Sequence, residues 1–354
     1  MRRLIGFVLT LALVTVPLAP VRAGTLVVAN KSEATVSLVD THTGEIRATL
    51  PTGNAPHEVD VSPNGELALV GNYGTRVEPG SSLTVVDVPA AKVIKTVELE
   101  KYSRPHGIVW LDNKHAVVTV EENRALIRVD VGKAEVVQAV TTDAEISHMV
   151  AVAPNHGLAF VANIGSGSVT IIDLALGNML DDIPTGEGAE GIAVTPNGKH
   201  VWITNRAEDT ITVVNASSRA VVAQLEAGSF PIRAEATADG RFVLVTNAKG
   251  DDLSVFDATE MKEIGRIEFA AVSKGDKGRL FSDRFGSSSV PIGIQIVDEE
   301  KRAYIAHANA DDISIVDLRQ WKVVGTLSAG KEPDGMGYSP LVVTGGPEDE
   351  TVED

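Results

Sequence analysis

Short apolar runs separated by polar turns recur along almost the whole chain. Residues 190–225 show the pattern most clearly, because "GIAVTPNG", "HVWITN", "TITVVN" and "AVVAQL" follow one another with only short turns between them. Segments rich in valine, isoleucine and threonine that are joined in this way are typical of β-strands connected by hairpins. No stretch shows the strong period of an amphipathic helix. The pattern therefore predicts an all-β protein made of four-stranded antiparallel units.

The unit repeats along the chain. A strand resembling "SLVD" ends at seven positions, which lie about 43 residues apart except before the last. Four strands in that length match one blade of a β-propeller. We therefore expect a seven-bladed β-propeller over residues 24–344, with the first strand of each blade lining the central channel. The seven strand ends are Asp40, Asp87, Asp130, Asp173, Asn215, Asp257 and Asp317.

The two ends of the predicted propeller complete each other. "LVVAN" near the start reads as the second strand of a blade, and "DGMGYSP" near the end reads as a first strand. A blade built from both termini would close the ring and pair two strand edges that otherwise invite aggregation. The last residues, 345–354, are predicted to form an acidic, disordered tail.

The predicted second strands share a motif. They read "VVAN", "FVAN", "VWITN" and "VLVTN", and "SPNG" or "TPNG" stands in the turns before several of them. The chain resembles the YVTN-repeat, or YncE-like, family of exported seven-bladed β-propellers, which implies the fold and export. Glu121 and His307 stand where we expect the asparagine of the motif. That asparagine is expected to cap the turn after the strand.

The first 23 residues read as a targeting segment. They contain paired arginines, a continuous apolar stretch over 4–18 and small residues ending at Ala23. This order predicts a secretory signal peptide rather than a membrane anchor, so we expect a periplasmic or secreted protein. The chain has no cysteine, which excludes disulfides, thiolate metal sites and covalent c-type haem. The net charge of -17 argues against a nucleic-acid partner, and we expect a monomer.

One aligned position carries the candidate chemistry. Each predicted blade contributes one residue at the start of its first strand, and strand direction places all seven at the same mouth of the channel. Around the closed ring, five neighbouring blades contribute ionisable groups and two contribute isoleucine. The simplest interpretation is a set of solvated polar groups bonded to their neighbours. The seven residues are His57, His106, His148, Glu190, Ile232, Ile292 and Asp334.

Two functional hypotheses use this mouth. In the first, His57, His106 and His148 bind a divalent transition metal, zinc or copper, with Glu190 or Asp334 as a further ligand or as a partner that fixes a tautomer. The expected function is then an exported binding module for a metal ion or small ligand.

In the second hypothesis, the same mouth binds a small organic anion or performs acid–base chemistry, as a lyase or a lactonase-like hydrolase. The candidate catalytic residues are His106, His148, Glu190 and Arg233. This alternative rests on analogy with other propellers. A third hypothesis is a scaffold for a protein partner.

An insertion is expected to cover the mouth. Residues 272–290 lengthen one connection between blades and bring basic and aromatic residues into an acidic chain. Long loops in compact domains often carry function, although this one could also be a connection packed on its blade. The expected lid and rim residues are Tyr102, Arg104, Arg279, Phe281, Arg284 and Phe285.

Overall fold

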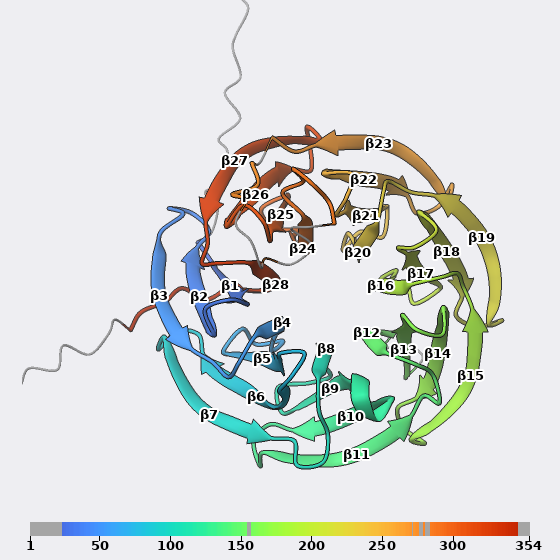
Figure 1. Ribbon diagram of the computed structural model, residues 1–354, viewed down its shortest axis with the longest axis horizontal. Coiled ribbons are helices and arrows are strands. Elements are labelled where there is room, and N and C mark those ends of the chain that lie inside the picture. The colour runs from blue at the N-terminus through green and yellow to red at the C-terminus, as the bar shows by residue number, and fades with distance from the viewer. Residues whose placement is uncertain (1–22, 154–156, 271, 276–278, 280–283, 346–354) are drawn as a thin grey trace, which may run out of the picture.

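The computed structural model describes residues 23–153, 157–270, 272–275, 279 and 284–345, and the signal segment, the acidic tail and Phe281 lie outside these ranges. Seven four-stranded antiparallel sheets surround a central channel (Figure 1). The predicted seven-bladed propeller is confirmed. Among the described residues, no helix is long and apolar enough to cross a membrane.

The blades are named A to G in ring order, and each is given from its innermost to its outermost strand. Blade A holds β28 (Pro333–Ser339), β1 (Thr25–Asn30), β2 (Thr35–Asp40) and β3 (Ile46–Pro51). Blade B holds β4 (Pro56–Val61), β5 (Leu67–Gly74), β6 (Pro79–Asp87) and β7 (Lys92–Glu98). Blade C holds β8 (Pro105–Trp110), β9 (His115–Val120), β10 (Ala125–Asp130) and β11 (Glu135–Thr141), with the 3-10 helix η1 (Glu121–Asn123) after β9.

The other four blades follow the same order. Blade D holds β12 (Ser147–Ala153), β13 (Leu158–Asn163), β14 (Ser168–Asp173) and β15 (Asn178–Pro184). Blade E holds β16 (Ala189–Val194), β17 (His200–Asn205), β18 (Thr210–Asn215) and β19 (Ala220–Glu226). Blade F holds β20 (Pro231–Ala236), β21 (Phe242–Asn247), β22 (Asp252–Asp257) and β23 (Lys262–Glu268). Blade G holds β24 (Pro291–Val297), β25 (Arg302–His307), β26 (Asp312–Asp317) and β27 (Lys322–Ser328).

Blade A closes the ring. Its innermost strand β28 comes from the end of the propeller sequence and pairs antiparallel with β1 from the beginning, so that Thr25 lies opposite Ser339. The pairing leaves neither strand as a free edge on that side. The closure predicted from the two sequence ends is therefore consistent with the structure.

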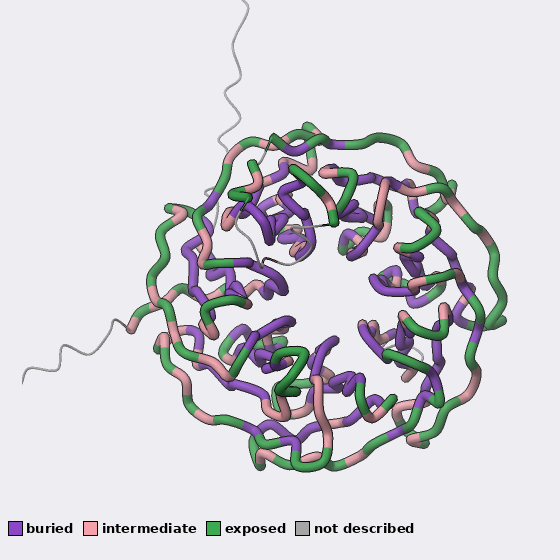
Figure 2. The backbone as a smooth tube through the Cα atoms, in the orientation of Figure 1, coloured by how far each residue is buried: buried purple, intermediate pink, exposed green. Residues whose placement is uncertain are grey.

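The core lies between neighbouring blades. The second and third strands of each blade are almost wholly buried, whereas the outermost strands alternate between exposed and half-buried residues (Figure 2). Trp202, Tyr304 and Phe160 are the largest fully buried side chains. Burying an aliphatic side chain contributes roughly 1.5 to 3 kcal/mol, so a large interblade core can stabilise this cysteine-free chain.

The asparagines of the repeated motif have a different role from the one predicted. In five blades an asparagine stands at or near the end of the second strand. Its side-chain amide donates hydrogen bonds to the third strand. In blade A, Nδ2 of Asn30 lies 3.0 Å from Oγ1 of Thr35 and 2.8 Å from Oγ of Ser37. The five asparagines are Asn30, Asn72, Asn163, Asn205 and Asn247.

Blade C corrects the predicted place of Glu121. In blade B, Pro56 pairs with Asn72, whereas in blade C Pro105 pairs with Val120. The hairpin of blade C is one residue shorter, so Val120 takes the position of the motif asparagine. Glu121 follows the strand as the first residue of η1.

Candidate functional site

The residues aligned in the sequence also align in space. Each is the second residue of its blade's innermost strand, and all seven are buried. The innermost strands run in the same direction around the channel, so these positions share one end of it (Figure 1). His57, His148, Glu190, Ile232 and Ile292 line a cavity of about 700 Å³ at that end, the mouth cavity.

The three histidines form a stack. The ring centroids of His57 and His106 lie 4.2 Å apart, and those of His106 and His148 lie 3.5 Å apart. His106, in the middle, is fully buried, and neither of its ring nitrogens has a hydrogen-bond partner among the described residues. Burial and the neighbouring charges of His148 and His57 hold the pKa of His106 well below its ordinary value. His106 is therefore neutral.

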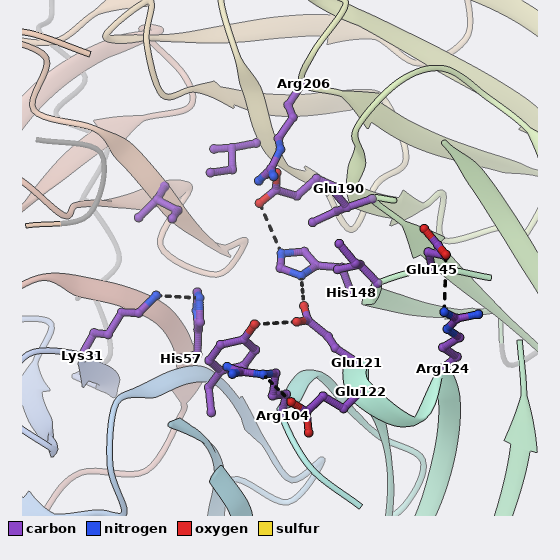
Figure 3. Close-up of a pocket in the computed structure, with 15 residues that line it drawn as sticks. Lys31, His57, Arg104, Glu121, Glu122, Arg124, Glu145, His148, Glu190 and Arg206 are labelled. Carbon is purple, nitrogen blue, oxygen red and sulfur yellow. Dashed lines mark hydrogen bonds and ion pairs between the residues drawn. The ribbon is translucent and has the colours of Figure 1, made fainter. Parts of the chain in front are cut away.

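His148 lies between two carboxylates (Figure 3). Its Nδ1 bonds to Oε1 of Glu121, and its Nε2 lies 3.2 Å from Oε1 of Glu190. The hydroxyl of Tyr73 donates to the other oxygen of Glu121 at 2.5 Å. Burial lowers the pKa of His148, but hydrogen bonds and charges from Glu121 and Glu190 outweigh burial and raise the pKa above its ordinary value. The imidazole is therefore held as a cation.

Glu190 is the most heavily paired carboxylate of the site. Burial raises its pKa, but His148, Arg206 and Arg233 together lower it to about 2. Arg206 bonds to Oε2 of Glu190 from the loop after β17. Glu190 is thus ionised throughout the physiological range, and its charge is balanced by neighbouring cations.

His57 connects a carboxylate to a lysine. Its Nδ1 lies 2.9 Å from Oδ2 of Asp334, a distance for an ion pair, and its Nε2 lies 2.8 Å from Nζ of Lys31. Nζ of Lys31 is also 3.5 Å from the same carboxylate oxygen. Burial raises the pKa of Asp334, but the charges of His57 and Lys31 outweigh it and hold the pKa below its ordinary range.

Arg233 lies beside Glu190 but lines a different cavity from the mouth cavity. Its guanidinium is buried between Oε1 of Glu58, at 2.6 Å, and Oε1 of Glu190, at 3.3 Å. Burial lowers the pKa of Arg233, but both carboxylates raise it above its ordinary value. The side chain lines a separate, deeper cavity of about 300 Å³ together with Met149 and Met336. Arg233 therefore forms part of the floor of the site.

A second set of aligned residues, which the sequence analysis missed, surrounds the mouth cavity. Each follows directly after the position that the motif asparagine holds in most blades, at or near the end of the second strand. Five of the seven line the mouth cavity, and the alanines of blades F and G lie in an apolar cluster beside it. The position after the motif asparagine is the signal that could have identified them. These residues are Lys31, Tyr73, Glu121, Ile164, Arg206, Ala248 and Ala308.

The expected lid and rim residues separate into different places. Arg104 lines the mouth cavity, with its guanidinium 5.2 Å from the ring centroid of Tyr73. Tyr102 packs against the apolar core between blades B and C. Arg279 is almost buried and forms an ion pair with Asp311 at 2.5 Å.

Two more of these residues border a neighbouring hollow. Arg284 lines a hollow of about 710 Å³ that adjoins the mouth cavity, and Phe285 packs against Phe230 with ring centroids 4.7 Å apart. The described residues of the insertion thus contact blades F and G, beside the mouth cavity.

Comparison with known proteins identifies a family and two similar folds. The family described as "Cytochrome D1 heme domain" matches residues 107–284, which is half of the chain. A functionally unknown protein from Desulfotomaculum acetoxidans has a similar structure, with a TM-score of 0.72 and 16% identity over 89% of this chain and 98% of that one. Hydrazine synthase of Kuenenia stuttgartiensis has a TM-score of 0.67 and 17% identity over 80% of this chain and 90% of that one. No curated protein sequence matches.

The family match overturns the prediction of a zinc or copper cofactor, because the group named by this family is a haem. The side chains also explain why the prediction failed. Candidate ligand atoms of His106, Glu121 and His148 do lie within 4.8 Å of one another. Yet His148 is itself a cation between its two carboxylates, and the ammonium group of Lys31 lies where a metal would approach His57. The charges of the site are balanced by its own side chains.

The described residues do not fit an axially ligated haem either. A haem iron is held by a histidine, methionine, cysteine or tyrosine side chain that is free to bind it. The chain has no cysteine, and the hydroxyl of Tyr73 in the mouth cavity is bonded to Glu121. Both ring nitrogens of His148 face carboxylates, and those of His57 face Asp334 and Lys31. His106 lies between these two rings, with centroid distances that leave no room for a macrocycle. No described imidazole therefore presents a free nitrogen to the mouth cavity.

Proposed function

We propose that this chain, which belongs to the cytochrome D1 heme domain family, binds a small organic anion with an apolar body in its mouth cavity. The observation that carries the proposal is the division of the mouth into a donor-rich side and an apolar side. The same proposal assigns the chain to ligand binding, since a concave cavity with a few convergent polar groups is typical of a ligand site.

The polar side has donors to spare, whereas its carboxylates are already bonded to protein side chains. Glu122 accepts from Arg104, and Glu145 accepts from Arg124. Lys31, Arg104 and Arg206 line the cavity, and each carries more N–H groups than its bonds to the described residues use. Both oxygens of Glu121 and both of Glu190 already accept bonds from protein side chains. A ligand that satisfies the remaining donors must itself supply acceptors, and a carboxylate or similar anion does so best.

The opposite side is apolar. Blades F and G contribute Ile232 and Ile292 at the first aligned position. Ile146 and Ile164 also line the cavity, but they lie on blade D, beyond the charged residues of blade E. Burial of an apolar ligand body against these side chains is favourable at roughly 25 cal/mol per Å². An inorganic anion would leave this wall unused, so the two-sided cavity favours an amphiphilic organic anion.

A fluorescent probe of this chemistry tests the proposal. Anilinonaphthalene sulfonate combines an apolar body with an anionic group, and it is expected to bind the purified chain and to be displaced by octanoate. Octylamine has a similar tail and the opposite charge, so it should compete poorly. Replacing Arg104 by Gln is expected to weaken probe binding about 10-fold, because a charge-assisted hydrogen bond is lost.

A matched control separates a local effect from a change in net charge. Lys199 lies in an exposed turn at the opposite end of the channel, and Lys199→Gln removes one positive charge there. This variant should bind the probe as the wild type does. Equal competition by octylamine and octanoate, or equal losses in the two variants, would contradict the proposal.

We also propose that the chain is an exported propeller of the YVTN type. The asparagines that join the second and third strands in five blades support the assignment, together with the apolar N-terminal segment. Sequencing the N-terminus of protein recovered from outside the cytoplasm should give Gly24 as the first residue. A mature chain that still begins at Met1 would contradict export through a cleaved signal.

A further inference from the structure

Lys31, His57 and Asp334 form a connected series at one edge of the mouth cavity. We propose that Lys31 is an amine nucleophile that forms an imine with a carbonyl group of the bound ligand, and that His57 serves as its base. The substrate class is a small aldehyde or ketone that also carries an anionic group. The anionic part of this class rests on the proposed function, whereas the reactivity of Lys31 stands on its own geometry.

The contact between Lys31 and His57 is unusual in kind. Nζ of Lys31 lies 2.8 Å from Nε2 of His57. Other lysines that form ion pairs, such as Lys133 and Lys274, bind carboxylates instead. Among the described residues, no other lysine is hydrogen-bonded to a ring nitrogen. Two nitrogens at this distance share one proton, so the imidazole can take the proton that keeps the amine from acting as a nucleophile.

Asp334 supplies the third member of the series. Its Oδ2 lies 2.9 Å from Nδ1 of His57, and its side chain is fully buried on β28. A carboxylate in this place stabilises the imidazolium that forms when His57 accepts a proton. Nucleophile, base and orienting carboxylate within reach of one another are the signature of an activated nucleophile.

The surroundings fix the base and leave the amine accessible. The ring of Tyr73 packs edge-on against His57 with centroids 5.3 Å apart, and His106 packs against its other side at 4.2 Å. The side chain of Lys31 is 17% exposed and lines the mouth cavity. A ligand whose anionic group binds the cations of the cavity can therefore bring a carbonyl group to Nζ.

The proposed reaction needs no further reagent. His57 takes a proton from the Lys31 ammonium, and the free amine attacks the carbonyl carbon. The electron pair of the broken C=O π bond moves to oxygen, which receives the proton back from His57 as a carbinolamine forms. Nζ still carries two protons, and one of them passes through His57 to the hydroxyl group, which leaves as water. A protonated C=N bond remains. One water is released for each imine, with no change in oxidation state.

Reductive trapping tests the proposal. The full chain is incubated with carboxybenzaldehyde and cyanoborohydride, and labelling of each lysine is followed by mass spectrometry. Lys331 is an exposed lysine of the same blade and provides the internal reference. Lys31 is expected to be labelled about 100-fold faster than Lys331 at neutral pH, a typical gain from a positioned base.

Variants separate the roles of the three residues. Lys31→Arg should abolish the fast labelling and keep the positive charge. His57→Gln should slow labelling of Lys31 to the rate of Lys331 and leave Lys331 unchanged. Asp334→Asn should also slow the labelling of Lys31, and it replaces His57→Gln in the experiment if that variant does not fold. Labelling of Lys31 no faster than Lys331, or a rate unaffected by both His57→Gln and Asp334→Asn, would overturn the proposal.

The same experiment distinguishes failure of this inference from failure of the proposed function. Neutral benzaldehyde is run in parallel with carboxybenzaldehyde. Fast labelling of Lys31 by both aldehydes alike would support the nucleophile and contradict the anion site. Binding of anilinonaphthalene sulfonate without any preferential labelling of Lys31 would support the anion site and contradict the nucleophile.

Discussion

Two buried histidines of this propeller differ in charge, because His148 is a cation and His307 is neutral. His148, at the mouth, is 7% exposed, and His307, inside blade G, is 0% exposed. His307 bonds only to hydroxyl groups, at 2.7 Å from Ser289 and 2.8 Å from Ser314, and burial lowers its pKa to about 3. His148 is buried almost as fully, yet its two carboxylate partners raise its pKa. Partners, more than burial, therefore decide the charge of a histidine in this ring.

The partners themselves follow from the strand register. His307 ends the second strand of blade G and bonds to the third strand, as the motif asparagines do in other blades. Glu121, the partner of His148, stands one residue beyond that position because the hairpin of blade C is shorter. His307 thus keeps the hydrogen bond between the second and third strands, although it replaces the asparagine. The shorter hairpin of blade C instead places the carboxylate of Glu121 at the mouth.

The largest expected effect is on the pH dependence of stability when His307 is replaced. Unfolded chains protonate this histidine near its ordinary pKa of 6.5, whereas the folded protein does so only near 3. Its contribution to stability is therefore complete above 6.5 and is lost as the pH falls between these values. We expect the stability of wild type relative to His307→Asn to fall by roughly 4 kcal/mol over this range. Urea unfolding at several pH values measures the free energy of unfolding of both proteins. The same pH dependence in both would refute the claim that folding lowers the pKa of His307.

The next effect removes a partner of His148. Glu121→Gln leaves a buried imidazolium with one carboxylate fewer, and breaking a buried pair in this way should cost about 3 kcal/mol at neutral pH. Denaturant unfolding measures the loss, and an NMR titration should show a lower pKa for His148. An unchanged histidine pKa would mean that Glu121 does not hold the charge.

A smaller effect concerns the pH dependence that His148 gives to stability, which runs opposite to that of His307. Because the pKa of His148 is raised on folding, its stabilising contribution is complete below the ordinary value of 6.5 and is lost as the pH rises through the folded value. We expect wild type to lose stability on the alkaline side more steeply than Glu121→Gln. Thermal melts across this pH range compare the slopes, and a steeper slope in the variant would contradict the prediction.

The smallest effect is expected one residue further along the same turn. The side chain of Glu122 is 47% exposed, and it binds Arg104 and Ser103 but no histidine. Glu122→Gln removes the same charge as Glu121→Gln and should cost less than about 1 kcal/mol. Equal losses in the two variants, measured by denaturant unfolding, would show that net charge and not the histidine contact matters.

The fold could be predicted because it repeats. Apolar segments of strand length at a blade-sized spacing leave few alternatives, and the same alignment brought His57, His106 and His148 to one level of the ring. The second aligned set, which includes Lys31 and Arg206, was missed because side-chain direction at the end of a strand depends on the local register. That register is visible only in the pairing, as the displacement of Glu121 in blade C demonstrates.

Neither the position of the Arg233 side chain nor the cofactor could be predicted, because both depend on side-chain directions and contacts that the sequence does not show. The pairing of β20 shifts between Pro231 and Arg233, and such irregularities redirect the side chains that follow. Residue types alone also favoured a metal site, since histidine and carboxylate are common ligands. Only the distances to Lys31 and between the stacked rings show that these groups are occupied with one another.

The meeting of the two chain ends in blade A has a consequence for biosynthesis. Lys31 follows the first strand to leave the ribosome, and Asp334 belongs to the last. A nascent or prematurely terminated polypeptide could assemble most of its blades and still lack the carboxylate behind His57. Reactivity toward a carbonyl reagent would therefore report that synthesis of the propeller had been completed.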